Sequence, residues 1–245
     1  MSPFSILPKD YTLQSALLEI MSKYKAELHA NGYYHIYNRT NNKELLFKDI
    51  DDRNFFLKKY SEYLLAYTNT FVYCLLGNHF HFLIKVKAVE FDNTQTIGVS
   101  KTPIVLPNQN TKPAKDKTPE IHKAFRNFFM SYAKAINKSY GRTGSLFQQK
   151  FERKLIDDEN YFTQLVLYIH YNPVKANIAS DYKNWKYSSF NAMLSDSPAF
   201  IKRKEVLDWF GEKDNFLIFK YKFKRTTFCF TIKVKLKAFT CVIKV

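Results

Sequence analysis

The chain has 245 residues, 46% of them hydrophobic, and a formal net charge of +16 at pH 7. That is enough apolar sequence for a sizeable core in one domain or two, and the basic excess indicates a polyanionic partner, nucleic acid before a membrane. No run approaches about 18 apolar residues, and the start lacks a signal-peptide pattern, so we expect neither a membrane span nor secretion. The three cysteines form no metal spacing and no disulfide framework, which predicts a reducing, cytoplasmic setting.

The charge is spread unevenly along the chain. Residues 220–245 hold seven lysines, one arginine and no acidic residue, so +8 of the net charge lies there and +8 in the rest. The chain also contains 17 tyrosines and 23 phenylalanines. Aromatic rings can stack on unpaired bases, although we expect most of these rings in the core.

The first third of the chain predicts helices and strands in alternation. An amphipathic helix is expected over about 11–24, and a strand over 33–38. The next helix is expected over 51–67, with Asp51 or Asp52 as its N-cap. These patterns contain no internal repeat.

A hairpin and an irregular segment are expected next. A strand over 71–76 is followed by Gly77 and Asn78, a turn signal that leads directly into the strand from His79. Residues 88–118 are polar, contain three prolines and show no periodicity. We therefore predict a flexible insertion there.

The second half predicts further helices around one strand. A helix is expected over about 118–140, a strand over 146–156 with basic outer positions, and a helix that starts at Asp158. The dipeptide Asn172-Pro173 is expected to end that last helix. A short helix is expected over about 204–210. The alternating residues 228–237 are compatible with an edge strand or with a basic disordered tail.

These patterns predict three regions. Residues 1–25 form an N-terminal extension, residues 26–216 form the main domain with its insertion at 88–118, and residues 217–245 form a basic C-terminal tail. The composition changes at both boundaries.

The two histidines of the sequence HFHFLIKV, at 79–86, are the first candidate site. Residues two apart on a strand share a face, so His79 and His81 point one way. The other face carries apolar residues that can be buried, which should aim the histidines outward: Phe80, Phe82, Ile84 and Val86. Neutral imidazoles are common metal ligands, but an isolated pair of this kind is more often structural.

The helix after Asp158 carries the second candidate site. Its apolar stripe marks the core face: Phe162, Leu165, Val166 and Ile169. Tyr168 and Asn172 are one turn apart on the flank of that stripe, so both side chains can reach one point. Packing and helix termination are the ordinary alternatives for these two residues.

Together the motifs resemble a known family. GYYHIYNR at 32–39, GNHFHFLI at 77–84 and YIHYNPV at 168–174 are similar to the single-tyrosine, insertion-sequence-200-like transposases of the HUH nuclease superfamily. Within them the REP-associated tyrosine transposase branch is most similar, and GSLFQ at 144–148 and WKYSS at 185–189 agree with it. The resemblance spans about residues 26–216.

The resemblance implies an α+β fold, an antiparallel sheet flanked by helices with a ferredoxin-like or RRM-like core. It implies that Tyr168 is the catalytic nucleophile and that Asn172 joins His79 and His81 as the third metal ligand. The expected cofactor is Mg²⁺ or Mn²⁺, and imidazole ligands favour Mn²⁺ of the two. The implied activity is a metal-dependent endonuclease and strand transferase that acts on single-stranded DNA through a 5′-phosphotyrosine intermediate.

The implied partner is single-stranded or hairpin DNA, bound by a monomer or a homodimer in the bacterial cytoplasm, in association with the nucleoid. Six basic side chains are candidate phosphate contacts: Arg39, Lys85, Lys87, Lys150, Arg153 and Lys154. His35 and Asn38 are candidates for reading bases or for a structural role.

Two other functions remain open from the sequence. One is a non-catalytic DNA-hairpin-binding protein with the same fold. The other is a metal hydrolase that uses His79, His81 and water, whose cleavage would survive the loss of Tyr168.

Overall fold

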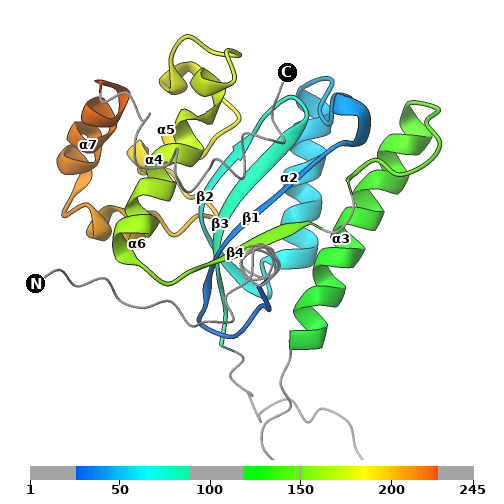
Figure 1. Ribbon diagram of the computed structural model, residues 1–245, viewed down its shortest axis with the longest axis horizontal. Helices are drawn as coiled ribbons and strands as arrows, with labels where there is room; N and C mark the ends of the chain where they lie inside the picture. The colour runs from blue at the N-terminus through cyan, green and yellow to red at the C-terminus, as the bar shows by residue number, and fades with distance from the viewer. Residues whose placement is uncertain (1–25, 89–117, 149–150, 226–245) are drawn as a thin grey trace, which may run out of the picture.

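A computed structural model describes residues 26–88, 118–148 and 151–225, and shows one antiparallel sheet with helices on both faces (Figure 1). The strand order is β2-β3-β1-β4. The bounds are Tyr33–Arg39 for β1, Thr68–Leu75 for β2, His79–Val86 for β3 and Glu152–Ile156 for β4. The expected α+β fold is confirmed, and β2 and β3 form the expected hairpin around Gly77 and Asn78.

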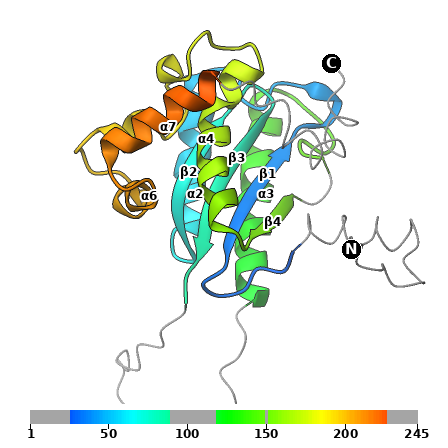
Figure 2. The same cartoon turned by 60° about the vertical axis from the view of Figure 1, so that its left-hand side comes forward.

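The helices divide between the two faces of the sheet. Helices α2 (Ile50–Leu64) and α3 (Thr118–Ser139) cover one face, and α4 (Glu159–Lys175) crosses the other (Figures 1 and 2). Shorter elements extend the α4 layer: η2 (Tyr182–Asn184), α5 (Phe190–Leu194), α6 (Arg203–Trp209) and α7 (Lys213–Arg225). A short η1 turn spans Asn41–Lys43. Among the described residues, no helix has the length and apolar character needed to cross a bilayer.

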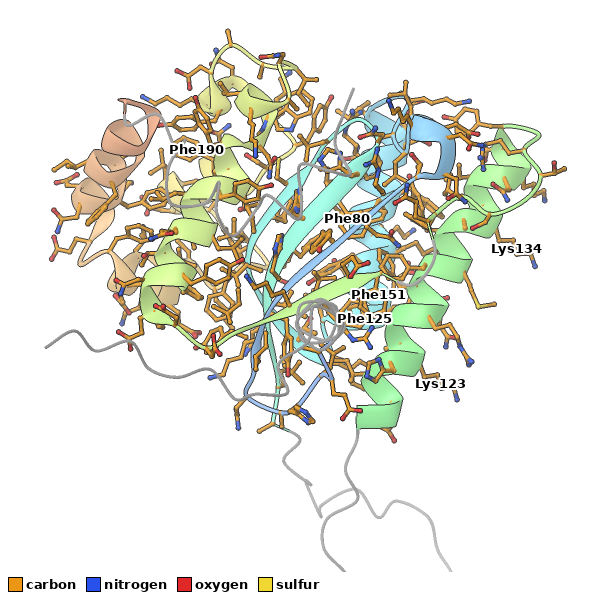
Figure 3. The ribbon with its side chains drawn as sticks, in the orientation of Figure 1. Phe80, Lys123, Phe125, Lys134, Phe151 and Phe190 are labelled. Carbon is orange, nitrogen blue, oxygen red and sulfur yellow. The ribbon has the colours of Figure 1, made fainter. Side chains whose placement is uncertain are left out.

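Aromatic packing joins the sheet to α2 and α3. The Phe80 ring lies 5.0 Å from Phe56, and the Tyr60 ring stacks on Phe82 at 4.3 Å. Figure 3 shows Phe80 and Phe125 between the sheet and α3, whereas Lys123 and Lys134 point away from it. The four apolar residues expected on this face of β3 are all buried in this core. Burying such rings strongly fixes the register of the strand.

A second core lies between the sheet and α4. The predicted stripe of α4 is buried there, with Leu83 of β3 and Phe190 of α5. A register shift between Thr70 and Val72 lets β2 place both Phe71 and Val72 in this core. The shift is a β-bulge, which puts one additional side chain on the helix-covered face.

The N-cap of α2 differs from the prediction. Asp49 is extended, at φ −139° and ψ −169°, and its carboxylate accepts a hydrogen bond from the Asp52 backbone N–H. The Asp52 carboxylate in turn accepts from the Lys48 backbone N–H at 2.8 Å. The cap is therefore Asp49 and not Asp51 or Asp52, because Asp49 has the extended backbone that a cap requires. The helix begins at Ile50 and ends at Leu64.

Within the described part of the strand expected over 146–156, the regular strand covers Glu152–Ile156. Phe147 forms an isolated bridge with Thr40, after Gly144 at φ +80°. The positive φ at Gly144 turns the chain just before the expected strand begins.

Pro173 does not end the last long helix, as the sequence suggested, but lies inside it. Proline removes one backbone donor, and the loss falls in the final turn. The turn still closes, because the Ala176 N–H donates to the Asn172 carbonyl at 2.8 Å. The helix therefore continues to Lys175 and keeps Asn172 in helical geometry.

The expected boundary between residues 216 and 217 falls within α7. Phe216 is fully buried and its ring lies 5.2 Å from Phe210. The helix expected over 11–24, residues 89–117 of the insertion expected over 88–118, and the segment 228–237 lie outside the described residues.

Candidate metal and nucleophile site

Neighbouring strands bring three histidines to the α4 face of the sheet. In the β1–β3 register, Arg39 lies opposite His79 and Tyr37 lies opposite His81. The rings of His79 and His81 are 5.2 Å apart, and His35 lies diagonally across from His81. The strand pattern suggested that His81 faces solvent, but this residue is only 4% exposed and faces the α4 layer.

Helix α4 places Tyr168 against these histidines. The Tyr168 ring lies 5.9 Å from His81 and 6.5 Å from His35, centroid to centroid. The buried stripe of α4 packs on the sheet and so brings the flank of the helix to the histidine strand. The structure therefore places Tyr168 beside His81 of the predicted pair, together with His35.

Asn172 lies one turn beyond Tyr168 and is 5% exposed. Its side chain interacts with the Tyr168 hydroxyl and lowers the pKa of that phenol, although burial has the larger effect and raises it. The Asn172 Nδ2 atom is buried and has no hydrogen-bond partner among the described residues. A buried amide without its partners is uncommon unless the site binds something.

Burial keeps the three imidazoles neutral. It lowers the pKa of His79 to about 4 and that of His35 to about 3, and the pKa of His81 lies well below its usual value. Neutral imidazole nitrogens have lone pairs for a metal. In His79, Nδ1 lies 2.6 Å from the Asn78 Oδ1, which can only accept, so Nδ1 carries the proton and Nε2 is bare.

Donor atoms of the types that bind divalent cations are present in this region. The predicted ligands His79 and His81 have imidazole nitrogens, and the Asn172 side chain has a neutral Oδ1 oxygen. Three protein ligands leave coordination positions for substrate, as catalytic metals require. The described residues contain no cluster of three or more histidines, cysteines or acidic groups that could hold a metal, so the set depends on the Asn172 carboxamide.

Lys175 joins the site although the sequence reasoning missed it. Its Nζ lies 5.2 Å from the centroid of the Tyr168 ring, and its charge lowers the pKa of His81. Lys175 follows Tyr168 by two helical turns, so the i, i+4, i+7 spacing of Tyr168, Asn172 and Lys175 was the available signal. This spacing goes unnoticed when the helix is expected to end at Pro173, before Lys175.

Three of the six basic candidates lie on the histidine face. Arg39 acts electrostatically on His79 from the opposing strand. The Nζ of Lys154 lies 4.1 Å from the centroid of the Tyr161 ring, and its charge lowers the pKa of His35, which is opposite it in the register. Lys85 pairs with Tyr33 and lies over its ring at 5.1 Å.

The other basic candidates lie elsewhere. The Arg153 Nε donates to the Ala26 carbonyl at 2.6 Å, and its guanidinium lies over Phe151 of the α3-side core. Lys87 donates to the Leu65 carbonyl at 2.6 Å. Lys150 lies outside the described residues.

The two base-reading candidates are covered. His35 and Asn38 are 5% and 7% exposed, which favours the structural alternative for both. Neither side chain is presented to a nucleobase in this conformation.

Comparisons with known proteins agree with the motifs. No family model matches the chain. A putative REP-associated tyrosine transposase from Haemophilus influenzae is 28% identical over 145 residues, which cover 59% of this chain and 68% of that protein.

A solved structure of a REP-associated tyrosine transposase bound to a REP hairpin has the same fold, with a TM-score of 0.50 and 15% identity. The match covers 73% of this chain and 89% of that chain. The resemblance to REP-associated tyrosine transposases is thus confirmed: this chain is similar to one of them in sequence and to another in fold.

Proposed function

We propose that this protein is a REP-associated type of tyrosine transposase, a metal-dependent enzyme that nicks and rejoins single-stranded DNA. The main support is the distance of 5.9 Å between the ring centroids of Tyr168 and His81, with Asn172 one helical turn from Tyr168. A binding protein has no need for a phenol beside a neutral imidazole, with a second imidazole and a buried carboxamide next to them.

The reaction is a transesterification at phosphorus. The Tyr168 phenol loses its proton and its oxygen forms a bond to the phosphorus, while the bond from phosphorus to the neighbouring 3′ oxygen breaks. That oxygen takes up a proton and leaves as a free 3′-OH, and Tyr168 keeps the 5′-phosphate. Because a phosphodiester is exchanged for a phosphodiester, a 3′-OH can reverse the step without an energy source.

The phenol requires help, because its usual pKa is about 10 and burial raises the pKa of Tyr168 further. The Nε2 atoms of His79 and His81 and the side-chain Oδ1 of Asn172 would hold Mg²⁺ or Mn²⁺. Such an ion supplies positive charge that offsets the charge developing on the phosphate oxygens. Lys175 adds a second cation beside the Tyr168 ring.

The substrate class follows from access to the phosphate. A regular duplex keeps its bases stacked and its backbone away from a covered site, whereas a single strand beside a hairpin can enter it. Arg39, Lys85 and Lys154 would bind flanking phosphates on the histidine face. We propose hairpin DNA with an unpaired flank as the partner, in the cytoplasm, bound by a monomer or homodimer.

Cleavage of an end-labelled DNA hairpin with a single-stranded flank tests this function. Wild-type protein with Mn²⁺ should nick the flank and form a covalent protein–DNA product. Tyr168→Phe should form none, whereas Tyr171→Phe, a matched change on the same helix, should retain it. Binding without any nicking would favour a hairpin-binding protein, and nicking by Tyr168→Phe without an adduct would favour a hydrolase that uses water.

A further inference from the structure

One of the proposed metal ligands, His81, contacts a further histidine, His35, on the neighbouring strand. The Nε2 of His35 is 2.9 Å from the Nδ1 of His81, and the rings are 27° from parallel with centroids 5.1 Å apart. His35 is 5% exposed and His81 is 4% exposed. Two buried imidazoles at this distance share a hydrogen bond, which requires a single proton between them.

That single proton can be attached to either ring. If His35 carries it, His81 accepts at Nδ1, and a neutral His81 must then carry its own proton on Nε2, which cannot bind a metal. If His81 carries it on Nδ1, His35 accepts, and Nε2 of His81 keeps a lone pair. Only the second arrangement makes His81 a ligand through Nε2.

His79 has an equivalent contact. Its Nδ1–H donates to the Asn78 Oδ1 at 2.6 Å, and its Nε2 is therefore bare. Asn78 is the neighbour of His79 along the chain, whereas His35 reaches His81 from the adjacent strand β1. Metal-bound histidines commonly have a second nitrogen fixed by an acceptor of this kind.

We propose that His35 is a positioning residue that accepts the Nδ1–H of His81 and so holds His81 in the tautomer with a bare Nε2. The inference rests on the proposed function, because it takes His81 as a metal ligand. The His35 ring also contacts the Tyr37 ring, and the two ring centroids are 4.8 Å apart. Its role requires an acceptor at the Nε2 position, which a glutamine Oε1 can also supply.

Titration with Mn²⁺, followed by calorimetry, tests the acceptor. His35→Leu should weaken Mn²⁺ binding by about 10–100-fold, the usual effect of losing an outer partner of a metal ligand. His35→Gln should remain close to wild type. His122→Leu, the same change on the α3 side of the sheet, is the matched control, and His81→Leu defines the signal that does not come from the site.

A ring ¹⁵N spectrum of the Mg²⁺-loaded protein reads the tautomer independently of activity. We expect a protonated Nδ1 and an unprotonated Nε2 on His81. A protonated Nε2 in the loaded protein would overturn the inference. Folded His35→Leu with wild-type Mn²⁺ affinity, or His35→Gln as weak as His35→Leu, would overturn it as well.

The outcomes separate this inference from the function on which it rests. If wild type gives no more Mn²⁺ binding than His81→Leu, the proposed metal site is wrong and the role of His35 with it. If wild type binds Mn²⁺ and forms the DNA adduct while His35→Leu binds equally well, only the inference about His35 is wrong.

Discussion

The ring of Tyr168 lies 5.9 Å from the ring of His81, although one belongs to helix α4 and the other to strand β3. The contact depends on the second core, where the buried stripe of α4 packs on the same face of the sheet that carries the histidines. The proposed nucleophile on α4 and the proposed histidine ligands on β3 are thereby held by packing rather than by a loop. Sites on such rigid elements keep their geometry before substrate arrives.

Lys175 should assist the chemistry without holding the metal. Its Nζ is 5.2 Å from the Tyr168 ring centroid, so Lys175→Met removes a charge that favours the phenolate and the phosphate. We expect adduct formation to slow about tenfold or more, with Mn²⁺ affinity preserved. Single-turnover kinetics on a labelled hairpin measure the rate. Lys175→Arg should recover most of it, and Lys186→Met, on an exposed segment, should resemble wild type.

Asn172 should contribute an oxygen to the metal. Asn172→Leu is close in size but has no donor, and Mn²⁺ affinity should fall by at least about tenfold. Asn172→Asp keeps an oxygen and adds charge, so it should bind Mn²⁺ at least as well as wild type. Calorimetry measures the affinity, and Asn160→Leu, at an exposed position on α4, is the control. Normal Mn²⁺ binding by Asn172→Leu would contradict this role.

Stability should fall as the pH is lowered through the histidine range. The unfolded histidines titrate near 6.5, whereas burial lowers the folded pKa of His35 to about 3 and of His79 to about 4. The unfolded chain therefore binds more protons as pH falls from 6.5 towards 4, which lowers the free energy of unfolding over that window. Urea unfolding measures the free energy of unfolding of wild type and of His35→Gln. The difference between the two should change from one side of the window to the other. The effects of the carboxylates cancel in that difference, because both proteins contain them.

If the difference between wild type and His35→Gln does not change between pH 7.5 and pH 4.5, which bracket about two units of the window, His35 is not held neutral by burial. The same comparison with His122→Leu should show a smaller change, because the pKa of His122 is lowered less far from a more exposed position.

Much of the fold was predictable because the sheet is buried on both faces by different residue types. Alternation along β3 separates the phenylalanine core from the histidine face, and the stripe of α4 identifies its own contact side. Helical spacing placed Tyr168 and Asn172 on one flank of α4, but the family resemblance, and not the spacing, gave them their predicted roles. The hairpin followed from Gly77 and Asn78, a pair that favours a tight turn.

The features that the sequence did not predict depend on tertiary contacts or on backbone geometry. The predicted caps of α2 were Asp51 and Asp52, but the cap is the nearby Asp49, and only the observed backbone distinguishes these acidic positions. Pro173 is a strong stop signal, but its effect is small within a last turn that is closed by the Ala176 N–H. The role of His35 required the register between two strands, which no local pattern supplies.

DNA binding should depend on the histidine face more than on the α3 face. Lys154 lies opposite His35 in the sheet, whereas Lys134 points away from the sheet on α3 (Figure 3). Lys154→Gln should weaken hairpin binding and reduce the slope of log affinity against log salt by about 1. Lys134→Gln is the charge-matched control. Equal losses in the two variants would show that the contact is a general attraction and not a binding face.

Peptide mapping of the covalent product tests the central claim most directly. After reaction of the full chain with a hairpin substrate and Mn²⁺, digestion and mass spectrometry should find the 5′-phosphate on Tyr168, and EDTA should prevent its formation. An adduct on another tyrosine, or DNA cleavage that leaves every tyrosine unmodified, would contradict the assignment of Tyr168 as the nucleophile at a histidine-bound metal.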